Sequence, residues 1–380
     1  MTKSVVEIQD LKIDFTTYEG IMKVLDGVNL RINKGEVLGL VGETGCGKTI
    51  TGRAIMRILP SNARVMNGKI IFEDGKDLLQ IDEDEMRSIR GKKISMIFQE
   101  PRRALHPTLP VWEQIAEVFS IHLKEEVLNL AIKKIDEIRA SAPNFSTPWL
   151  NIIDSIYKKE INREKPFLKK FLEKIPFVGN SINKITNDVL KEKSVEMLGK
   201  VQMPDPRRVS NLYAHELSGG MMQRVLISMA LPCNPNLLIA DEPTTAVDVT
   251  TQAKILDLIM NLKKMYETSI LLITHNLAVV AETCNRVSVM YAGTIVEEAD
   301  TMSIFHKPLH PYTQSLLAAV PIIGRERELK SIPGTVPNFL QPPPGCRFHP
   351  RCNYAKDLCS KEKPIFKEVE EGHYVACHHI

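Results

Sequence analysis

The stretch Gly42–Thr49 constrains this 380-residue chain more than any other. It reads G-x-x-x-x-G-K-T, follows the apolar run Val37–Val41 and precedes a segment, 51–59, that suits a helix. Glycines let backbone N–H groups curl around phosphate oxygens, and a helix N-terminus adds a positive dipole end. The pattern therefore predicts a phosphate-binding loop, with Lys48 on the β- and γ-phosphates and Thr49 on Mg²⁺. A nucleoside triphosphate would contact Gly42, Glu43, Thr44, Gly45, Cys46, Gly47, Lys48, Thr49 and Ile50.

The amino-acid composition limits the class of protein that this chain can belong to. Hydrophobic residues at 43% and charged residues at 25% are ordinary for a globular chain, and a net charge of +3 argues neither for nor against a nucleic-acid partner. No run approaches the roughly 18 apolar residues of a transmembrane helix. The first residues lack an apolar signal core, so we expect the chain to stay in the cytoplasm. Its seven cysteines then point to metal or reactive thiols before disulfides.

Polar residues follow three apolar strands. Ile94–Phe98 leads to Gln99, Leu237–Ala240 leads to the adjacent carboxylates Asp241 and Glu242, and Ile270–Thr274 leads to His275. The carboxyl ends of parallel strands gather at one edge of a sheet, beside the phosphate-binding loop. Asp241 is expected in the Mg²⁺ shell, and Glu242 is expected to orient or deprotonate water. Gln99 is positioned to touch Mg²⁺ or the attacking water.

The region between these strands is helical and charged. A serine and two glycines, Ser218–Gly220, begin a predicted helix, whose N-terminus is a second place where an anion can bind. Within 124–186 a lysine-rich stretch, Lys158–Lys174, ends near an apolar face. This face fits a docking or membrane-surface helix, or an amphipathic helix that covers its own subdomain, which is the commoner case.

Together these motifs resemble the ATP-binding subunit of an ABC transporter. The resemblance implies an α/β fold of the P-loop NTPase class, with a RecA-like core, an antiparallel β subdomain and a helical subdomain. It implies a nucleotide-binding domain over 1–322, with the helical subdomain at about 100–232 and an insertion at about 124–186, whose role the resemblance leaves open. In the family's terms, Gly42–Thr49 is the Walker A motif, Gln99 the Q-loop and Leu237–Asp241 the Walker B motif. Leu217–Met221 is the signature motif, with Met where many members have Gln. Glu242 is the catalytic carboxylate, Ala246–Asp248 the D-loop and His275 the switch histidine.

Two stretches are similar to the dipeptide, oligopeptide and nickel importer group. These are Ile239–Thr245, followed by Asp248–Thr250, and His310–Leu317, followed by Pro321. The D-loop reads Ala-Val-Asp where that group usually has Ala-Leu-Asp. The resemblance implies ATP hydrolysis that powers peptide uptake, with oligosaccharides or nickel as alternative cargo. A soluble ABC ATPase without a permease is the rival from another class.

The resemblance also implies an assembly. Two ATPase subunits pair head to tail, so that Ser218, Gly219 and Gly220 of one complete the triphosphate site of the other, and Asp248 communicates across the interface. Tyr18 or Phe15 would stack on adenine. The partners would be a second, non-identical ATPase, two transmembrane permeases and an extracytoplasmic solute-binding protein, with no nucleic acid. This chain would then lie at the cytoplasmic face of the cell membrane.

The composition shifts after about residue 322. Five prolines between 331 and 345 form a stiff tether, and a 35-residue end can hardly build its own core. Some members of the peptide-importer group carry a [4Fe–4S] cluster here, and Gly345–Cys346 with His349–Cys352 resembles that site. We therefore expect an extension, 323–380, with a four-cysteine cluster that leaves phosphate chemistry untouched. Zinc and unligated thiols are the alternatives. The expected ligands are Cys346, Cys352, Cys359 and Cys377, one of which His349, His373, His378 or His379 could replace.

Overall fold

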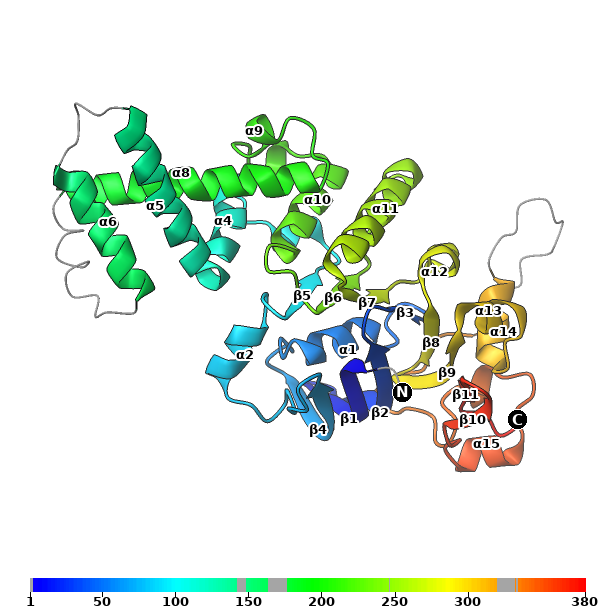
Figure 1. Cartoon of the computed structure of the whole chain (residues 1–380). Helices are drawn as coiled ribbons and strands as arrows, with labels where there is room; N and C mark the ends of the chain where they lie inside the picture. Colours follow the sequence, from blue (N-terminus) through cyan, green and yellow to red (C-terminus); the bar gives the residue numbers. More distant parts are fainter. Residues whose placement is uncertain (1–2, 142–147, 163–175, 246, 320–331, 333) are drawn as a thin grey trace. The chain divides into compact units, whose positions relative to one another are not determined.

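The computed structural model describes residues 3–141, 148–162, 176–245, 247–319, 332 and 334–380. The chain divides into two compact units (Figure 1). The phosphate loop and all three polar strand ends belong to the first unit. The first unit comprises Met1–Gln99, Asn234–Thr245 and Leu256–Ile380, and the second comprises Glu100–Cys233 and Ala246–Ile255.

The first unit is built on an eight-stranded sheet. Strands β3, β5, β6, β7 and β8 pair in parallel, while β9, β11 and β10 continue one edge in antiparallel pairing. The parallel strands are almost wholly buried apolar runs, which is typical of strands covered on both faces. The spatial order is β10 (Lys367–Glu370), β11 (His373–Val375), β9 (Thr294–Asp300), β8 (Arg286–Tyr291), β3 (Val37–Val41), β7 (Ser269–Ile273), β6 (Leu237–Asp241) and β5 (Ile94–Ile97).

A second, antiparallel sheet of the first unit has the order β2 (Gly20–Asn33), β1 (Ser4–Thr17) and β4 (Ala63–Phe72). One hydrophobic core joins it to the main sheet and to α1 (Lys48–Ile55), the helix that follows the phosphate loop. The helix that follows the phosphate loop is therefore anchored in the same core as both sheets. Further helices of the unit are α2 (Glu83–Ile89), α12 (Leu277–Thr283), α13 (Thr301–His306), α14 (Pro311–Ala318), η3 (His349–Arg351) and α15 (Asp357–Lys361).

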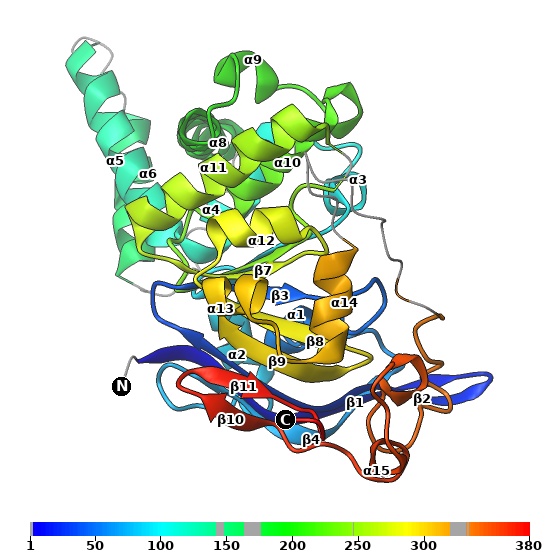
Figure 2. The same ribbon diagram turned by 90° about the vertical axis from the view of Figure 1, so that its right-hand side faces the viewer.

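The tail, residues 334–380, shares the core of the first unit. Strand β11 extends the main sheet beside β9 (Figure 2). Phe348 is fully buried, and its ring centre lies 5.0 Å from that of Tyr291 and 5.4 Å from that of Tyr312. The tail, which is too short to form a core of its own, is thus stabilised by packing on the core of the first unit. The boundary expected at residue 322 falls in 320–331, outside the described residues, and stays a prediction.

The second unit is helical. Its long helix α8 (Pro176–Lys200) packs with α4 (Val111–His122) and α5 (Lys124–Ser141). The fully buried Tyr157 of α6 (Pro148–Ile161) donates a hydrogen bond to the carbonyl of Ile182 at 3.0 Å. The end of the lysine-rich stretch, 163–175, lies outside the described residues. No helix in the described part of the chain is both long and apolar enough to cross a bilayer. The helices are α3 (Pro101–Ala104), α4 (Val111–His122), α5 (Lys124–Ser141), α6 (Pro148–Ile161), α8 (Pro176–Lys200), α9 (Pro206–Val209), η2 (Ala214–Glu216), α10 (Gly219–Ala230) and the start of α11 (Val249–Tyr266).

Candidate nucleotide site

The phosphate loop has a backbone that only glycine can adopt at its two ends. Gly47 caps α1 with φ at 110°, and Gly42 has φ at 153°. A Cβ atom on Gly42 would lie 2.1 Å from the carbonyl oxygen of Met290. The loop is therefore pressed against the end of β8. Gly45, in contrast, has no atom within 4 Å of the position of a Cβ atom, so the middle of the loop is open to a ligand.

Lys48 is a buried cation with neutral partners. Only 5% of the residue is exposed, and its Nζ donates to the carbonyl oxygens of Gly42 at 2.8 Å and Glu43 at 3.0 Å. A buried ammonium group is strongly stabilised by an anion, because the low local dielectric strengthens their attraction. Lys48 is therefore suited to bind a phosphate group.

Thr49 and Asp241 bring two hard oxygen donors together. The Thr49 hydroxyl donates to Oδ1 of Asp241 at 3.0 Å, and Asp241 is buried at the end of β6. Burial raises the pKa of this carboxyl to about 6. Hydroxyl and carboxylate oxygens are the donors that Mg²⁺ prefers, and a divalent cation would favour the ionised carboxylate. The pair therefore fits Mg²⁺.

Glu242 is the most restrained carboxylate of the site. Its backbone is left-handed, with φ at 46°, and only 11% of its side chain is exposed. The carboxylate accepts hydrogen bonds from Gln99 Nε2 at 3.1 Å and Thr245 Oγ1 at 3.0 Å, and it lies 2.9 Å from His275 Nδ1. Burial alone would raise the pKa of Glu242, but the hydrogen bonds and the charge of His275 lower it. An ionised, oriented carboxylate of this kind suits a general base.

Sequence comparisons decide the family. A sequence model of the family described as "ABC transporter" matches residues 25–245, which is more than half of the chain. The chain belongs to the ABC transporter family. A second family model, described as "Oligopeptide/dipeptide transporter, C-terminal region", matches residues 296–359. This bears out the resemblance drawn from the motifs.

Curated relatives match almost the whole chain. It is 40% identical to the probable peptide ABC transporter ATP-binding protein y4tR of Sinorhizobium fredii, over 98% of this chain and 94% of the relative. It is 41% identical to the oligopeptide transport ATP-binding protein OppD of Bacillus subtilis, over 97% of this chain and 87% of the relative. The dipeptide transport ATP-binding protein DppD of the same species is 37% identical, over 99% of this chain and 94% of the relative.

Solved structures support the fold. The dimeric structure of MJ0796, a bacterial ABC transporter cassette, aligns with a TM-score of 0.54 and 22% identity, over 78% of this chain and 98% of that chain. CbiO1 of Clostridium perfringens aligns with a TM-score of 0.52 and 20% identity, over 80% of this chain and 92% of that chain. The predicted α/β ABC-type fold is therefore confirmed.

The structure gathers most of the predicted ABC motifs in the first unit and leaves the others in the second. Walker A, the Q-loop, Walker B, Glu242 and His275 meet around Lys48 and Asp241, as predicted from the strand ends. In the second unit Ser218 caps α10, since its hydroxyl accepts the amide of Met221 at 3.3 Å. A Cβ on Gly220 would lie 2.6 Å from a Thr251 methyl. Asp248 accepts the amide and hydroxyl of Thr251, and Gly219 opens α10.

The two candidate adenine-stacking aromatics differ in exposure. Tyr18 lies in the turn between β1 and β2 with 98% of its surface exposed. Phe15 packs against the hydrophobic core of the first unit. Tyr18 is therefore the more accessible of the two rings, and the stacking role stays a prediction.

The prediction of a [4Fe–4S] cluster in the tail is wrong. Among the described residues no group of three or more His, Cys, Asp or Glu side chains is placed to hold a metal ion, and zinc is equally unsupported. Burial raises the pKa of Cys346 to about 11. Burial likewise raises the pKa of Cys352 and of Cys377. The four candidate histidines have other partners. The rings of His349, His378 and His379 bond to the backbone carbonyls of Cys346, Glu362 and Tyr354, and the ring of His373 bonds to the carboxylate of Glu297.

The tail does reach the phosphate loop, and the expectation that it leaves phosphate chemistry untouched stays a prediction. Arg351 of η3 forms a bidentate ion pair with Glu43 of Walker A, at 2.7 and 3.0 Å. The hydroxyl of Tyr312 in α14 accepts the amide of Glu43 at 2.9 Å. In the sequence, Arg351 stands out only as a neighbour of Cys352, and Tyr312 only as part of a stretch similar to the importer group. No local signal links either residue to a loop some 300 positions earlier.

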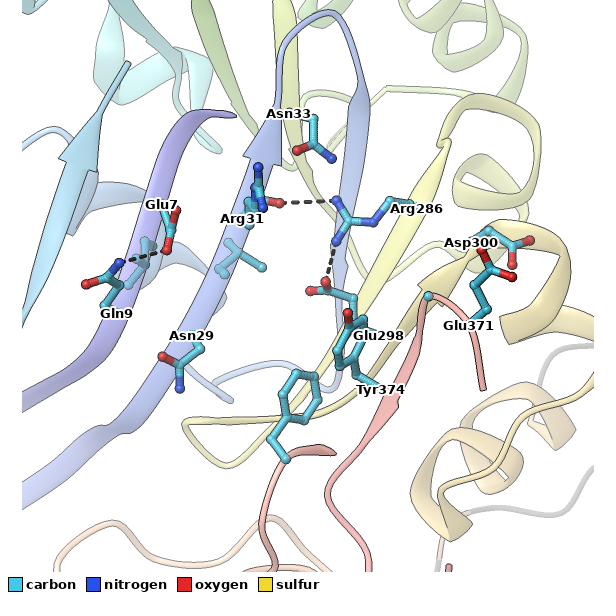
Figure 3. Close-up of a pocket in the computed structure, with 14 residues that line it drawn as sticks. Glu7, Gln9, Asn29, Arg31, Asn33, Arg286, Glu298, Asp300, Glu371 and Tyr374 are labelled. Atoms are coloured by element: carbon cyan, nitrogen blue, oxygen red, sulfur yellow. Dashed lines mark hydrogen bonds and ion pairs between the residues drawn. The ribbon is translucent and has the colours of Figure 1, made fainter. Parts of the chain in front are cut away.

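An open pocket of about 560 Å³ lies elsewhere in the first unit, between the two sheets (Figure 3). Arg286 at its wall pairs with Glu298 and, at 3.0 Å, with Glu36. It also donates to the carbonyl of Arg31 at 3.3 Å. These charges hold β8 and β9 against β2, so the pocket wall has a structural role.

Proposed function

We propose that this chain is the ATP-hydrolysing subunit of an importer that takes up peptides. One observation supports hydrolysis above all: the two adjacent carboxylates at the end of β6 have different hydrogen-bond partners, which suits them to different roles. Asp241 bonds to the loop hydroxyl of Thr49, while Glu242 is held ionised by Gln99, Thr245 and His275. The match of the C-terminal region, 296–359, and the peptide names of the relatives support the cargo. Those names give no support to oligosaccharides or nickel.

The proposed chemistry uses residues of the first unit. Lys48 exchanges the carbonyls of Gly42 and Glu43 for phosphate oxygens. Thr49 and Asp241 hold Mg²⁺, with Gln99 beside them, and bound Mg²⁺ supplies neutralisation of phosphate charge. Glu242 aligns the attacking water and takes its proton, and His275 keeps the carboxylate oriented. Tyr18 stacks on adenine.

The proposed assembly is composite. Ser218, Gly219 and Gly220 of one ATPase subunit complete the site of another, and Asp248 couples the two. The second ATPase is a different chain, and both dock peripherally on two permeases at the cytoplasmic face, with a solute-binding protein outside. A nucleotide-binding domain over 1–322 and an extension over 323–380 remain part of this proposal.

Reconstitution tests the function. The chain, its partner ATPase and the permeases are placed in liposomes with the solute-binding protein, and ATP hydrolysis and peptide uptake are measured together. We expect peptide-loaded binding protein to stimulate hydrolysis and labelled peptide to accumulate. The matched control is a complex with Glu242→Gln, which should bind ATP without uptake. Hydrolysis that is indifferent to peptide, with no accumulation, would contradict the proposal.

A further inference from the structure

Glu43 is the residue at which three separate elements meet. Its amide donates to the hydroxyl of Tyr312 from α14 at 2.9 Å. Its carbonyl accepts Nζ of Lys48 from α1 at 3.0 Å, and its carboxylate pairs with Arg351 from η3. Every polar group of this Walker A residue is thus engaged, two of them by the C-terminal part of the chain.

Arg351 is itself held in place. Only 6% of its side chain is exposed, and its guanidinium carbon lies 5.7 Å from the ring centre of Tyr291, whose hydroxyl it also reaches at 3.3 Å. The hydrogen bonds with Glu43 raise the pKa of Arg351 above its usual range. Bidentate pairs that are shielded from water and fixed by packing are stronger than ordinary surface ion pairs.

Tyr312 is held by a helix cap. Nδ1 of the fully buried His310 accepts the amide of Tyr312 at 3.0 Å, and Pro311 occupies the first turn of α14. Burial lowers the pKa of His310 to about 3, so its ring stays neutral and can accept. The Tyr312 ring centre lies 4.6 Å from that of Tyr291. The sequence His-Pro-Tyr therefore fixes the direction of one hydroxyl group toward the phosphate loop.

We propose that Arg351 and Tyr312 are positioning residues that hold Glu43, and with it the phosphate loop, in the conformation that receives the triphosphate. This inference rests on the proposed function. When a phosphate group replaces Glu43 as the partner of Lys48, the loop loses one restraint and keeps the two that the C-terminal part supplies. A loop ordered in advance loses less conformational entropy on binding. The coupling is reciprocal, so bound nucleotide also tightens the hold of the loop on Arg351.

The test measures binding of N-methylanthraniloyl-ATP with Mg²⁺ to the full chain by fluorescence. The variants are Arg351→Gln, Glu43→Gln and their combination. We expect each single variant to raise Kd about tenfold, the effect of losing a charge-assisted pair. The double variant should bind no more weakly than the weaker single one, because both changes break the same contact. Tyr312→Phe, which removes only a hydroxyl group, should raise Kd about threefold.

The matched control is Lys363→Gln. Lys363 joins the tail to Asp26 by an ion pair of 3.0 Å but does not touch the loop. We expect this variant to keep the wild-type Kd, while Arg351→Lys recovers part of the affinity lost in Arg351→Gln. Equal weakening by Lys363→Gln, or additive effects in the double variant, would overturn the inference.

A reference variant separates the two proposals. Lys48→Ala should abolish binding whatever the tail does. If it does so while Arg351→Gln, Glu43→Gln and Tyr312→Phe bind like wild type, the positioning role is refuted and the nucleotide site stands. If wild type binds no better than Lys48→Ala, the proposed function fails first. Nucleotide should also slow amide hydrogen exchange in η3, and an unchanged rate would contradict the reciprocal coupling.

Discussion

The carboxyl edge of the parallel strands and the C-terminal tail both reach the phosphate loop, but they are built in different ways. At the edge each polar residue lies within two positions of the end of its own buried strand, as Gln99 does after β5 and His275 after β7. In the tail Arg351 comes from a three-residue helix whose place depends on aromatic packing over Tyr291. The edge is therefore set by local chain geometry, and the tail by packing between distant segments.

The two regions also differ in their electrostatics. The edge keeps a carboxylate, Glu242, whose pKa is lowered, beside another, Asp241, whose pKa is raised, which separates their chemical roles. Around the tail, burial lowers the pKa of His310 to about 3 and raises that of Cys346 to about 11, so both groups are neutral, while the buried charge of Arg351 is paired with Glu43. We infer that the edge performs chemistry and the tail positions it. Four experiments test this division of roles between the edge and the tail.

The largest effect is expected at the edge. Glu242→Gln should reduce ATP turnover by about 10²–10⁴, because the general base is lost, while nucleotide still binds. Turnover and nucleotide affinity are measured on the reconstituted complex. Glu282→Gln, an exposed change on α12, is the control and should turn over like wild type. Wild-type turnover in the Glu242→Gln complex would remove Glu242 from its proposed role.

The next effect concerns acid stability around the tail. His310 has a pKa of 6.5 when unfolded and about 3 when folded, so the unfolded chain binds more protons between these values. Its contribution to stability is complete above pH 6.5 and is lost as pH falls toward 3. Between pH 6.5 and 5 the loss should be about 2 kcal/mol.

Urea unfolding followed by circular dichroism at pH 7 and pH 5 measures this loss. His310→Asn keeps a capping acceptor and should show a smaller drop between the two pH values. The exposed His306→Asn should behave like wild type. The same drop in all three proteins would show that His310 is not the responsible group.

An effect of similar size tests how tightly the tail is packed. Gly345 has φ at 66°, and a Cβ there would lie 2.5 Å from the carbonyl oxygen of Cys359. Gly345→Ala should destabilise the first unit by about 1–3 kcal/mol, since strain and a backbone clash combine. Gly372→Ala has a similar φ of 70° but open space, so it should lose only about 1 kcal/mol. If urea unfolding gives the same loss of unfolding free energy for both variants, the backbone around Gly345 can shift to accommodate the added methyl group.

The smallest effect separates positioning from chemistry. Tyr312→Phe should raise the KM for ATP about threefold and leave kcat unchanged, because it removes one hydrogen bond to the loop. Steady-state hydrolysis by the complex gives both constants. A fall in kcat at constant KM would place Tyr312 among the groups that act in the transition state.

Most of the candidate site could be predicted from the sequence, because its signals are local. A buried apolar run that ends in Asp241 and Glu242 predicts a strand end, and G-x-x-x-x-G-K-T predicts the loop beside it. The cysteine spacing was a weaker signal. It indicated that four thiols lie in one short segment, but metal binding depends on the directions of the side chains. Packing sets these directions, and they are not visible in a spacing pattern.

The sequence by itself determined the ABC family, the phosphate loop and the polar ends of three strands. Only the tertiary structure decided that Arg351 meets Glu43, 308 positions away, and that Phe348 packs beside Tyr312 and Tyr291. The physical reason is the range of the interactions involved. Strands, turns and helix caps depend on residues within a few positions of one another, whereas an ion pair between two ends of a chain exists only after the core between them has formed.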